Sequence, residues 1–183
     1  MTLANKITVS RIVTIPIFFI LLLNQSFPWA TLVGGLSGVT DALDGLVARK
    51  FKQQTPLGIF LDPLADKLFL LAAYGGLTAI HVTPVWVLVV ILSKDLIVLM
   101  GWMLLFILTD SSAVTTRFLG KSATATQMLY AGTVLLSKSF ESAAKITNPF
   151  LPFLLGAMVA LTVISMLDYV IFGSKILKQS GHH

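Results

Sequence analysis

The chain has 183 residues, of which 56% are hydrophobic and only 11% are charged, and it contains no cysteine. A soluble domain carries about 25% charged residues, so the composition excludes an ordinary soluble domain, and the missing cysteines exclude disulfides, Cys-ligated zinc and thiol nucleophiles. The net charge of +5 does not indicate nucleic-acid binding, because the cations lie at the ends of apolar runs, as membrane orientation requires. We therefore predict an integral membrane protein.

Long apolar runs divided by polar or proline-containing breaks predict an all-α polytopic protein with six transmembrane helices. The expected helices cover residues 9–24, 29–50, 58–80, 84–108, 122–138 and 150–173. The polar start of the chain leaves room for a short juxtamembrane helix before the first span. We expect residues 1–180 to form a single membrane domain, and we interpret residues 181–183 as the remnant of an expression tag.

Basic residues are distributed unequally between the two sides of the membrane that six spans define. Nine lie on the side of both termini, against Lys138 and Lys145 on the other: Lys6, Arg11, Arg49, Lys50, Lys52, Arg117, Lys121, Lys175 and Lys178. This bias predicts that both termini are cytoplasmic. The small size and the lack of a transit peptide favour a prokaryotic inner membrane.

Half of the eight acidic residues lie in the stretch 41–66, which forms a cytoplasmic hairpin in this topology: Asp41, Asp44, Asp62 and Asp66. Spacings of three and four residues place each pair on one face of a helix. Four carboxylates close together in an apolar environment repel one another, and divalent cations relieve that repulsion. Oxygen ligands without neighbouring Cys or His suit Mg²⁺ or Mn²⁺. Ion pairs with the nearby cations are the plainer alternative, but intramembrane carboxylates usually serve function.

Residues around the aspartates complete a longer pattern, Asp41-x2-Asp44-Gly45-x2-Ala48-Arg49-x8-Gly58-x3-Asp62-x3-Asp66. This pattern resembles the signature of the CDP-alcohol phosphotransferase family at every fixed position and spacing. The resemblance implies an enzyme that transfers a phosphatidyl-type group from a CDP-linked lipid to an alcohol and releases CMP. It also implies a homodimer, and the predicted topology places the active site on the cytoplasmic side.

The resemblance also implies roles for single residues. The four aspartates would hold two divalent cations, Mg²⁺ or Mn²⁺, and Asp66 would in addition be the catalytic base on the acceptor hydroxyl. Residues implied to contact the CDP-lipid are Asn5, Thr8, Gly45, Ala48, Arg49, Thr55 and Gly58. Asn5, Thr8 and Thr55 are also ordinary candidates for helix caps, and small residues such as Gly45 and Gly58 are common in helix packing.

The acceptor alcohol is indicated by two further stretches. "NKITVSRIVTIPIFFILLL" at the start and "GKSATATQM" at 120–128 resemble the phosphatidylglycerophosphate synthase branch, which implies CDP-diacylglycerol as donor and sn-glycerol 3-phosphate as acceptor. Candidates for binding the acceptor phosphate are Arg117, Lys121 and Lys94, although the first two are equally suited to anchor the inner face. Lys94 and Asp95 lie well inside a span, and adjacent helical residues point about 100° apart, so they need not pair.

Alternatives from the same family and from other classes remain open. The block "SKDLIVLMG" at 93–101 also resembles cardiolipin synthases of the family, whose acceptor is phosphatidylglycerol, and an inositol phosphate is a third acceptor. A small transporter would show inverted repeats and broken helices, and no repeat is visible. An inactive metal-binding homologue would be expected to have lost some of the aspartates, and all four are present.

Overall fold

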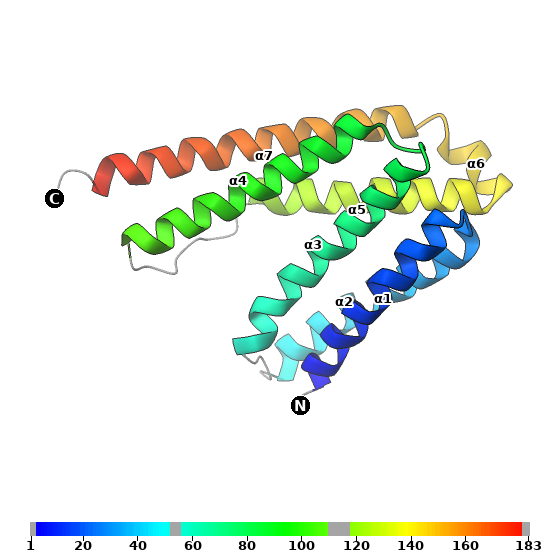
Figure 1. Ribbon diagram of the computed structural model, residues 1–183, viewed down its shortest axis with the longest axis horizontal. Helices are drawn as coiled ribbons and strands as arrows, with labels where there is room; N and C mark the ends of the chain where they lie inside the picture. Colours follow the sequence, from blue (N-terminus) through cyan, green and yellow to red (C-terminus); the bar gives the residue numbers. More distant parts are fainter. Residues whose placement is uncertain (1–2, 52–55, 110–117, 181–183) are drawn as a thin grey trace. The chain divides into compact units, whose positions relative to one another are not determined.

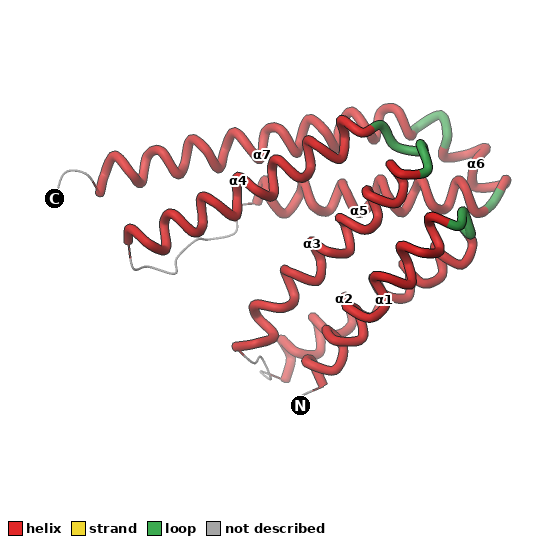
Figure 2. Tube along the Cα trace, in the orientation of Figure 1, coloured by secondary structure: helices red, strands yellow, loops and turns green. Residues whose placement is uncertain are grey.

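The computed structural model describes residues 3–51, 56–109 and 118–180, with side chains described for residues 13–40, 65–101, 118–172 and 174. Every element in these ranges is helical, and none of the described residues forms a strand (Figures 1 and 2). The helices are α1 (Leu3–Leu23), α2 (Phe27–Phe51), α3 (Pro56–Ala79), α4 (Val85–Thr109), α5 (Phe118–Ser139), α6 (Glu141–Thr147) and α7 (Leu151–Ser180). The all-helical prediction is confirmed.

Six of these helices correspond to the six predicted ones, with moved boundaries. α1 begins at Leu3 and absorbs the polar stretch for which a separate juxtamembrane helix was allowed. α7 continues to Ser180, beyond the expected end at 173. The seventh helix, α6, was not predicted, because Phe140 at its N-cap makes no side-chain cap hydrogen bond and so offers no capping signal in the sequence.

α1 and α3 end in the same pattern of backbone hydrogen bonds. Gln25 and His81 have positive φ values of 54° and 59°. Ser26 N–H donates to the Leu21 carbonyl and Gln25 N–H to that of Leu22, and Val82 and His81 repeat the arrangement on Leu77 and Thr78. This is the Schellman arrangement, and it ends α1 and α3 where the sequence predicted turns.

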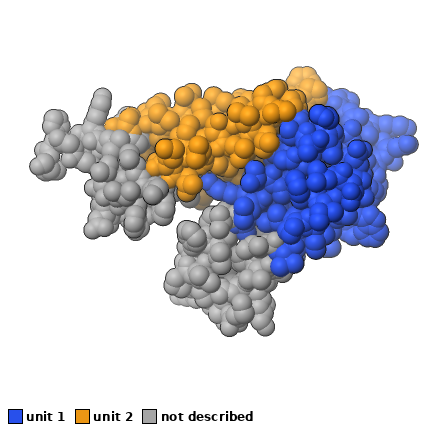
Figure 3. All heavy atoms as spheres, viewed as in Figure 1, with its two compact units in different colours: residues 1–83, 131–149 blue, residues 84–130, 150–183 orange. Residues whose placement is uncertain are grey.

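The chain separates into two compact units, residues 1–83 with 131–149 and residues 84–130 with 150–183 (Figure 3). In unit 1, α1 packs against both α2 and α3. Phe18 of α1 is fully buried and stacks on Phe69 of α3 with ring centroids 4.7 Å apart. A Cβ on Gly34 of α2 would come within 3.0 Å of the Phe18 ring. The three helices therefore meet closely because a glycine lies at the contact.

In unit 2, α4 packs along α7 (Figure 1), and the first part of α5 contacts α7. Buried apolar side chains from these helices include Val87, Ile91, Ala123 and Met158. Unit 2 also buries several polar side chains, although polar side chains are mostly exposed in folded proteins. The prediction of a single domain over residues 1–180 stays a prediction, and residues 181–183 lie outside the described residues.

The predicted number of membrane spans stays a prediction as well. Within the part of the chain whose side chains are described, Leu151–Phe172 is long and apolar enough to cross a membrane, with mean hydropathy 2.1. Val13–Leu23 is a shorter apolar helix. Large apolar side chains such as Leu96, Leu99 and Phe153 are more than half exposed, which fits contact with lipid as well as with other protein.

Candidate active site

The backbone brings the signature residues to one end of unit 1. α2, which carries positions 41–49, ends there, and α3, which carries positions 58–66, begins there (Figure 1). The first turns of α1, with positions 5 and 8, lie at the same end. Positions 41–49 and 58–66 are helical as predicted, whereas positions 5 and 8, expected before the first span, lie inside α1. Residues 52–55, with Thr55, lie outside the described residues.

The two pairs of aspartates lie on consecutive helices near this end of unit 1. At 1.5 Å per residue, Asp41 and Asp44 lie about 21 and 26 Å along α2 from Phe27, and Asp66 and Asp62 lie about 20 and 26 Å along α3 from Ala79. Each pair therefore belongs to the part of its helix that lies at the end where α2 ends and α3 begins.

Asp66 is the one member of the four whose side chain is described. It is half-buried and interacts with a neighbouring group, and the preceding Ala65 is fully buried in the packing of α3. The described side chains contain no group of three or more His, Asp or Glu that could hold a metal, but Asp41, Asp44 and Asp62 are not among them. The donor set itself, four carboxylates with no His or Cys between residues 41 and 66, fits hard divalent cations.

The residues implied to contact the CDP-lipid are placed only by their backbone. Asn5 and Thr8 belong to α1, Gly45, Ala48 and Arg49 to α2, and Gly58 to α3. Their roles therefore stay predictions.

Lys94 and Asp95 of α4 form an ion pair, with Lys94 Nζ 3.2 Å from Asp95 Oδ1. The Lys94 side chain is 5% exposed and that of Asp95 is 21% exposed. Sequence spacing alone left this pairing undecided, and it forms because the flexible four-carbon stem of lysine can bend back along the helix. A buried ammonium needs such a partner, since an unpaired charge in an apolar interior is very costly.

The structure describes only one of the two remaining candidates for binding the acceptor phosphate. Lys121 is exposed in the first turn of α5, and Arg117 lies outside the described residues. Lys121 follows Gly120, where an added Cβ would lie 2.9 Å from the Tyr169 hydroxyl oxygen. The start of α5 is therefore held closely against α7 at this glycine.

The sequence analysis did not predict a polar contact between α5 and α7. Gln127 Nε2 donates to Thr162 Oγ1 at 3.0 Å, and Thr162 Oγ1 donates to the Met158 carbonyl at 2.7 Å. Gln127, Thr162 and the nearby Ser165 are fully buried. Positions 120 and 127 face positions 169 and 162, so the same seven-residue step on both antiparallel helices sets their register. The only local signal was a glutamine inside an apolar run.

Comparison with known proteins assigns the family. A sequence model of the CDP-alcohol phosphatidyltransferase family matches residues 1–171. The chain is 34% identical to the CDP-diacylglycerol–glycerol-3-phosphate 3-phosphatidyltransferase of Bacillus subtilis over 98% of both chains. It is 36% identical to the Haemophilus influenzae enzyme of the same name, over 90% of this chain and 89% of that one. It is also 37% identical to a CMP-forming cardiolipin synthase of Streptomyces coelicolor, over 74% of this chain and 65% of that protein.

The chain therefore belongs to the CDP-alcohol phosphatidyltransferase family, and the resemblance seen in the aspartate signature is confirmed.

Proposed function

We propose that this protein transfers the phosphatidyl group of CDP-diacylglycerol to sn-glycerol 3-phosphate, giving phosphatidylglycerophosphate and CMP. The observation that supports this most is the placement of the four aspartates near the end of α2 and the start of α3, at one end of unit 1, in a chain of this family. The names of the Bacillus subtilis and Haemophilus influenzae relatives, which cover nearly the whole chain, support the donor and the acceptor.

The membrane arrangement that goes with this activity has six crossings, by α1 to α5 and α7. Both termini and the aspartates would lie on the cytoplasmic side of a prokaryotic inner membrane, as the distribution of Lys and Arg favours. A lipid donor would then keep its acyl chains in the bilayer while its nucleotide reaches the aspartates from the cytoplasm. A homodimer is the expected assembly.

Asp41, Asp44, Asp62 and Asp66 would hold two divalent cations, Mg²⁺ or Mn²⁺. When bound, such a pair neutralises charge on the diphosphate oxygens and on the departing CMP. The aspartates themselves fix where the diphosphate lies relative to α2 and α3. Arg49, about one helical turn beyond Gly45, suits a fork-like contact to a phosphate.

The transfer itself needs one substitution at phosphorus. The acceptor hydroxyl oxygen bonds to the phosphorus that carries diacylglycerol, and the bond from that phosphorus to the bridging oxygen breaks, so CMP leaves with that oxygen. Asp66 accepts the hydroxyl proton as the new bond forms. Gly45, Ala48 and Gly58 would allow the nucleotide to approach the helix backbone, and Asn5, Thr8 and Thr55 would contact its polar groups.

The acceptor phosphate requires cations, and Arg117, Lys121 and Lys94 remain the candidates. Lys94 already has Asp95 as its partner at 3.2 Å, so phosphate binding there would have to exchange or share that contact. A second acceptor, phosphatidylglycerol, is favoured by the similarity to the Streptomyces coelicolor cardiolipin synthase over 74% of the chain. Such an acceptor brings its own phosphodiester.

The test is CMP release by purified protein from CDP-diacylglycerol with Mg²⁺ or Mn²⁺ and a single acceptor in each reaction. Glycerol 3-phosphate should support release, and phosphatidylglycerol and myo-inositol phosphate should not. Asp66→Asn should lower the rate by about 10²-fold or more, the usual contribution of a general base. Glu141→Gln, a change at an exposed acid of α6, is the matched control and should leave the rate unchanged.

Two results would count against the proposal in different ways. Release with phosphatidylglycerol but not with glycerol 3-phosphate would replace the acceptor and keep the chemistry. No release with any acceptor would contradict the proposed activity.

A further inference from the structure

A groove of about 560 Å³ runs along the outer face of α2 in unit 1. Its lining includes Pro28, Leu32, Gly35 and Val39, which recur every three or four residues along the helix, and Phe140 beyond the end of α5. Trp29, Leu36 and Val39 of this lining are 59–64% exposed. The volume falls within the range of ligand-binding clefts, about 300–1,000 Å³, and the lining is almost wholly apolar.

The groove is separate from the aspartate site. At 100° per residue, positions 41 and 44 fall on the side of the α2 wheel opposite to the lining positions. The same opposite side carries Ala30, which is fully buried, and Gly34, whose added Cβ would lie 3.0 Å from the ring of Phe18 of α1. The aspartate positions thus follow the packed face of α2, and the groove follows its unpacked face.

The length of the groove matches one leaflet of a bilayer. From Pro28 to Val39 the helix rises about 16 Å, and half of a hydrocarbon core is about 15 Å thick. The end at Pro28 and Trp29 lies near the start of α2, which is the non-cytoplasmic end in the proposed topology. An acyl chain of the outer leaflet would fill this length.

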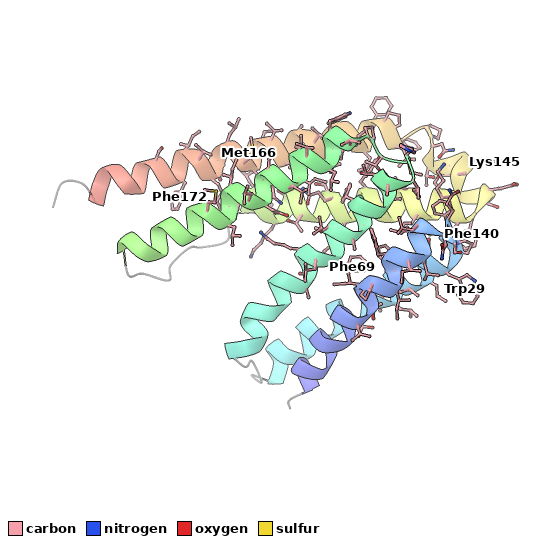
Figure 4. All side chains as sticks on the ribbon, in the orientation of Figure 1. Trp29, Phe69, Phe140, Lys145, Met166 and Phe172 are labelled. Carbon is pink, nitrogen blue, oxygen red and sulfur yellow. The ribbon has the colours of Figure 1, made fainter. Side chains whose placement is uncertain are left out.

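Two exposed lysines belong to the helix ends next to the Pro28–Trp29 end of the groove. Thr31 Oγ1 lies 2.7 Å from Ser139 Oγ, which fixes the end of α5 at the groove, and Ser137 Oγ lies 2.6 Å from Asn148 Oδ1, which holds the C-terminal end of α6 beside it. The exposed Lys138 and Lys145 are the cations of these two helix ends, with Glu141 between them. Figure 4 shows Lys145 at the same end of unit 1 as Trp29 and Phe140. Lys138, Lys145 and Glu141 together carry one net positive charge. Trp29, at the same end, is of the residue type that is enriched at membrane–water interfaces.

We propose that this groove binds an anionic phospholipid of the outer leaflet, with an acyl chain between Trp29 and Val39 and the headgroup phosphate at Lys138 and Lys145. The inference rests on the proposed membrane topology. It assigns a lipid site on the leaflet opposite to the active site, separate from the site for the lipid donor. One uncompensated cation near a lipid surface corresponds to about a fivefold preference for an anionic lipid.

The test uses the tryptophan of the groove as the reporter. In a Trp86→Phe/Trp102→Phe background Trp29 is the single tryptophan, and brominated acyl chains quench it on contact. Phosphatidylcholine vesicles containing brominated phosphatidylglycerol or brominated phosphatidylcholine give the relative affinity of the two lipids at Trp29. We expect phosphatidylglycerol to be preferred about fivefold and the preference to fall to about one in Lys138→Gln/Lys145→Gln.

Gly35→Phe places a ring on the groove-lining position 35, where an added Cβ meets no described atom within 4 Å. This variant should also lose the preference. Gly156→Phe on α7 is the matched control, since its Cβ is equally free of described neighbours, and it should keep the preference.

Four results would overturn the proposal. Two concern the lipid preference: equal affinity for both lipids in the unmodified groove, or a preference that survives Gly35→Phe. The other two are quenching of Trp29 only by brominated CDP-diacylglycerol, and protection of Trp29 from every lipid in a dimeric sample. The last two would assign the groove to the donor's acyl chains or to a second copy of the chain. CMP release is measured on the same samples, so a loss of the proposed activity with the lipid preference intact would contradict the proposed function alone.

Discussion

Replacing Thr162 by valine removes one hydroxyl at the contact between α5 and α7 while nearly keeping the shape of the side chain. Gln127 Nε2 then loses its acceptor at 3.0 Å, and the hydroxyl's own bond to the Met158 carbonyl is lost as well. Both side chains are fully buried, so water cannot replace the bond. We expect Thr162→Val to lower the free energy of unfolding by about 1–2 kcal/mol.

A double-mutant cycle with Gln127→Leu isolates the hydrogen bond. Interhelical bonds in membrane proteins contribute about 0.6 kcal/mol on average and about 1.7 kcal/mol at most. The coupling energy should fall in that range, so the double variant should be less destabilised than the sum of the single ones. Unfolding by SDS in mixed micelles, followed by circular dichroism, measures all four free energies.

Thr126→Val provides the control cycle. Thr126 Oγ1 donates to the carbonyls of Ser122 and Ala123 in its own helix, so its coupling to Thr162→Val should be close to zero. A coupling for Gln127 and Thr162 no larger than that of the control would refute the reasoning that this bond fixes α5 on α7.

Three further predictions follow from single contacts and from the donor set. Gly120→Ala should destabilise the protein by about 1 kcal/mol because its Cβ would lie 2.9 Å from the Tyr169 hydroxyl. Adding Tyr169→Phe should restore part of that stability in the same unfolding assay, since ring atom Cε2 stays at 3.2 Å. Gln25→Gly should raise the free energy of unfolding by up to about 1 kcal/mol, since Gln25 holds a φ of 54° at the end of α1, whereas Leu23→Gly inside the helix should lower it. Removal of divalent cations with EDTA should abolish CMP release. Mg²⁺ or Mn²⁺, but not Ca²⁺, should restore it, because near-octahedral geometry is required. Unchanged release in EDTA would contradict the role proposed for the aspartates.

Local sequence determined most of the helical layout. Apolar runs and the breaks at 24–26 and 81–84 placed six helices close to where they lie, because helix formation and chain reversal depend on neighbours within a few residues. The same locality explains the errors. α6 lacks a side-chain cap at Phe140, and no proline or glycine stops α1 from extending back to Leu3.

The aspartate cluster could also be predicted in part. Spacings of three and four residues fix which positions share a helix face, and the signature is specific enough to indicate the family from residues 41–66 alone. That the end of α2 and the start of α3 lie at the same end of unit 1 is seen only in the folded chain.

The sequence by itself thus determined the six long helices, the family and the positions of the four aspartates, since each depends on residues close together in the chain. The tertiary structure decided which polar side chains pair and which faces stay open. The Lys94–Asp95 ion pair depends on the burial around α4, and the Gln127–Thr162 hydrogen bond joins residues 35 positions apart. The groove on α2 is completed by Phe140 from a distant helix end. Such contacts depend on how helices pack, and packing is set by many side chains at once.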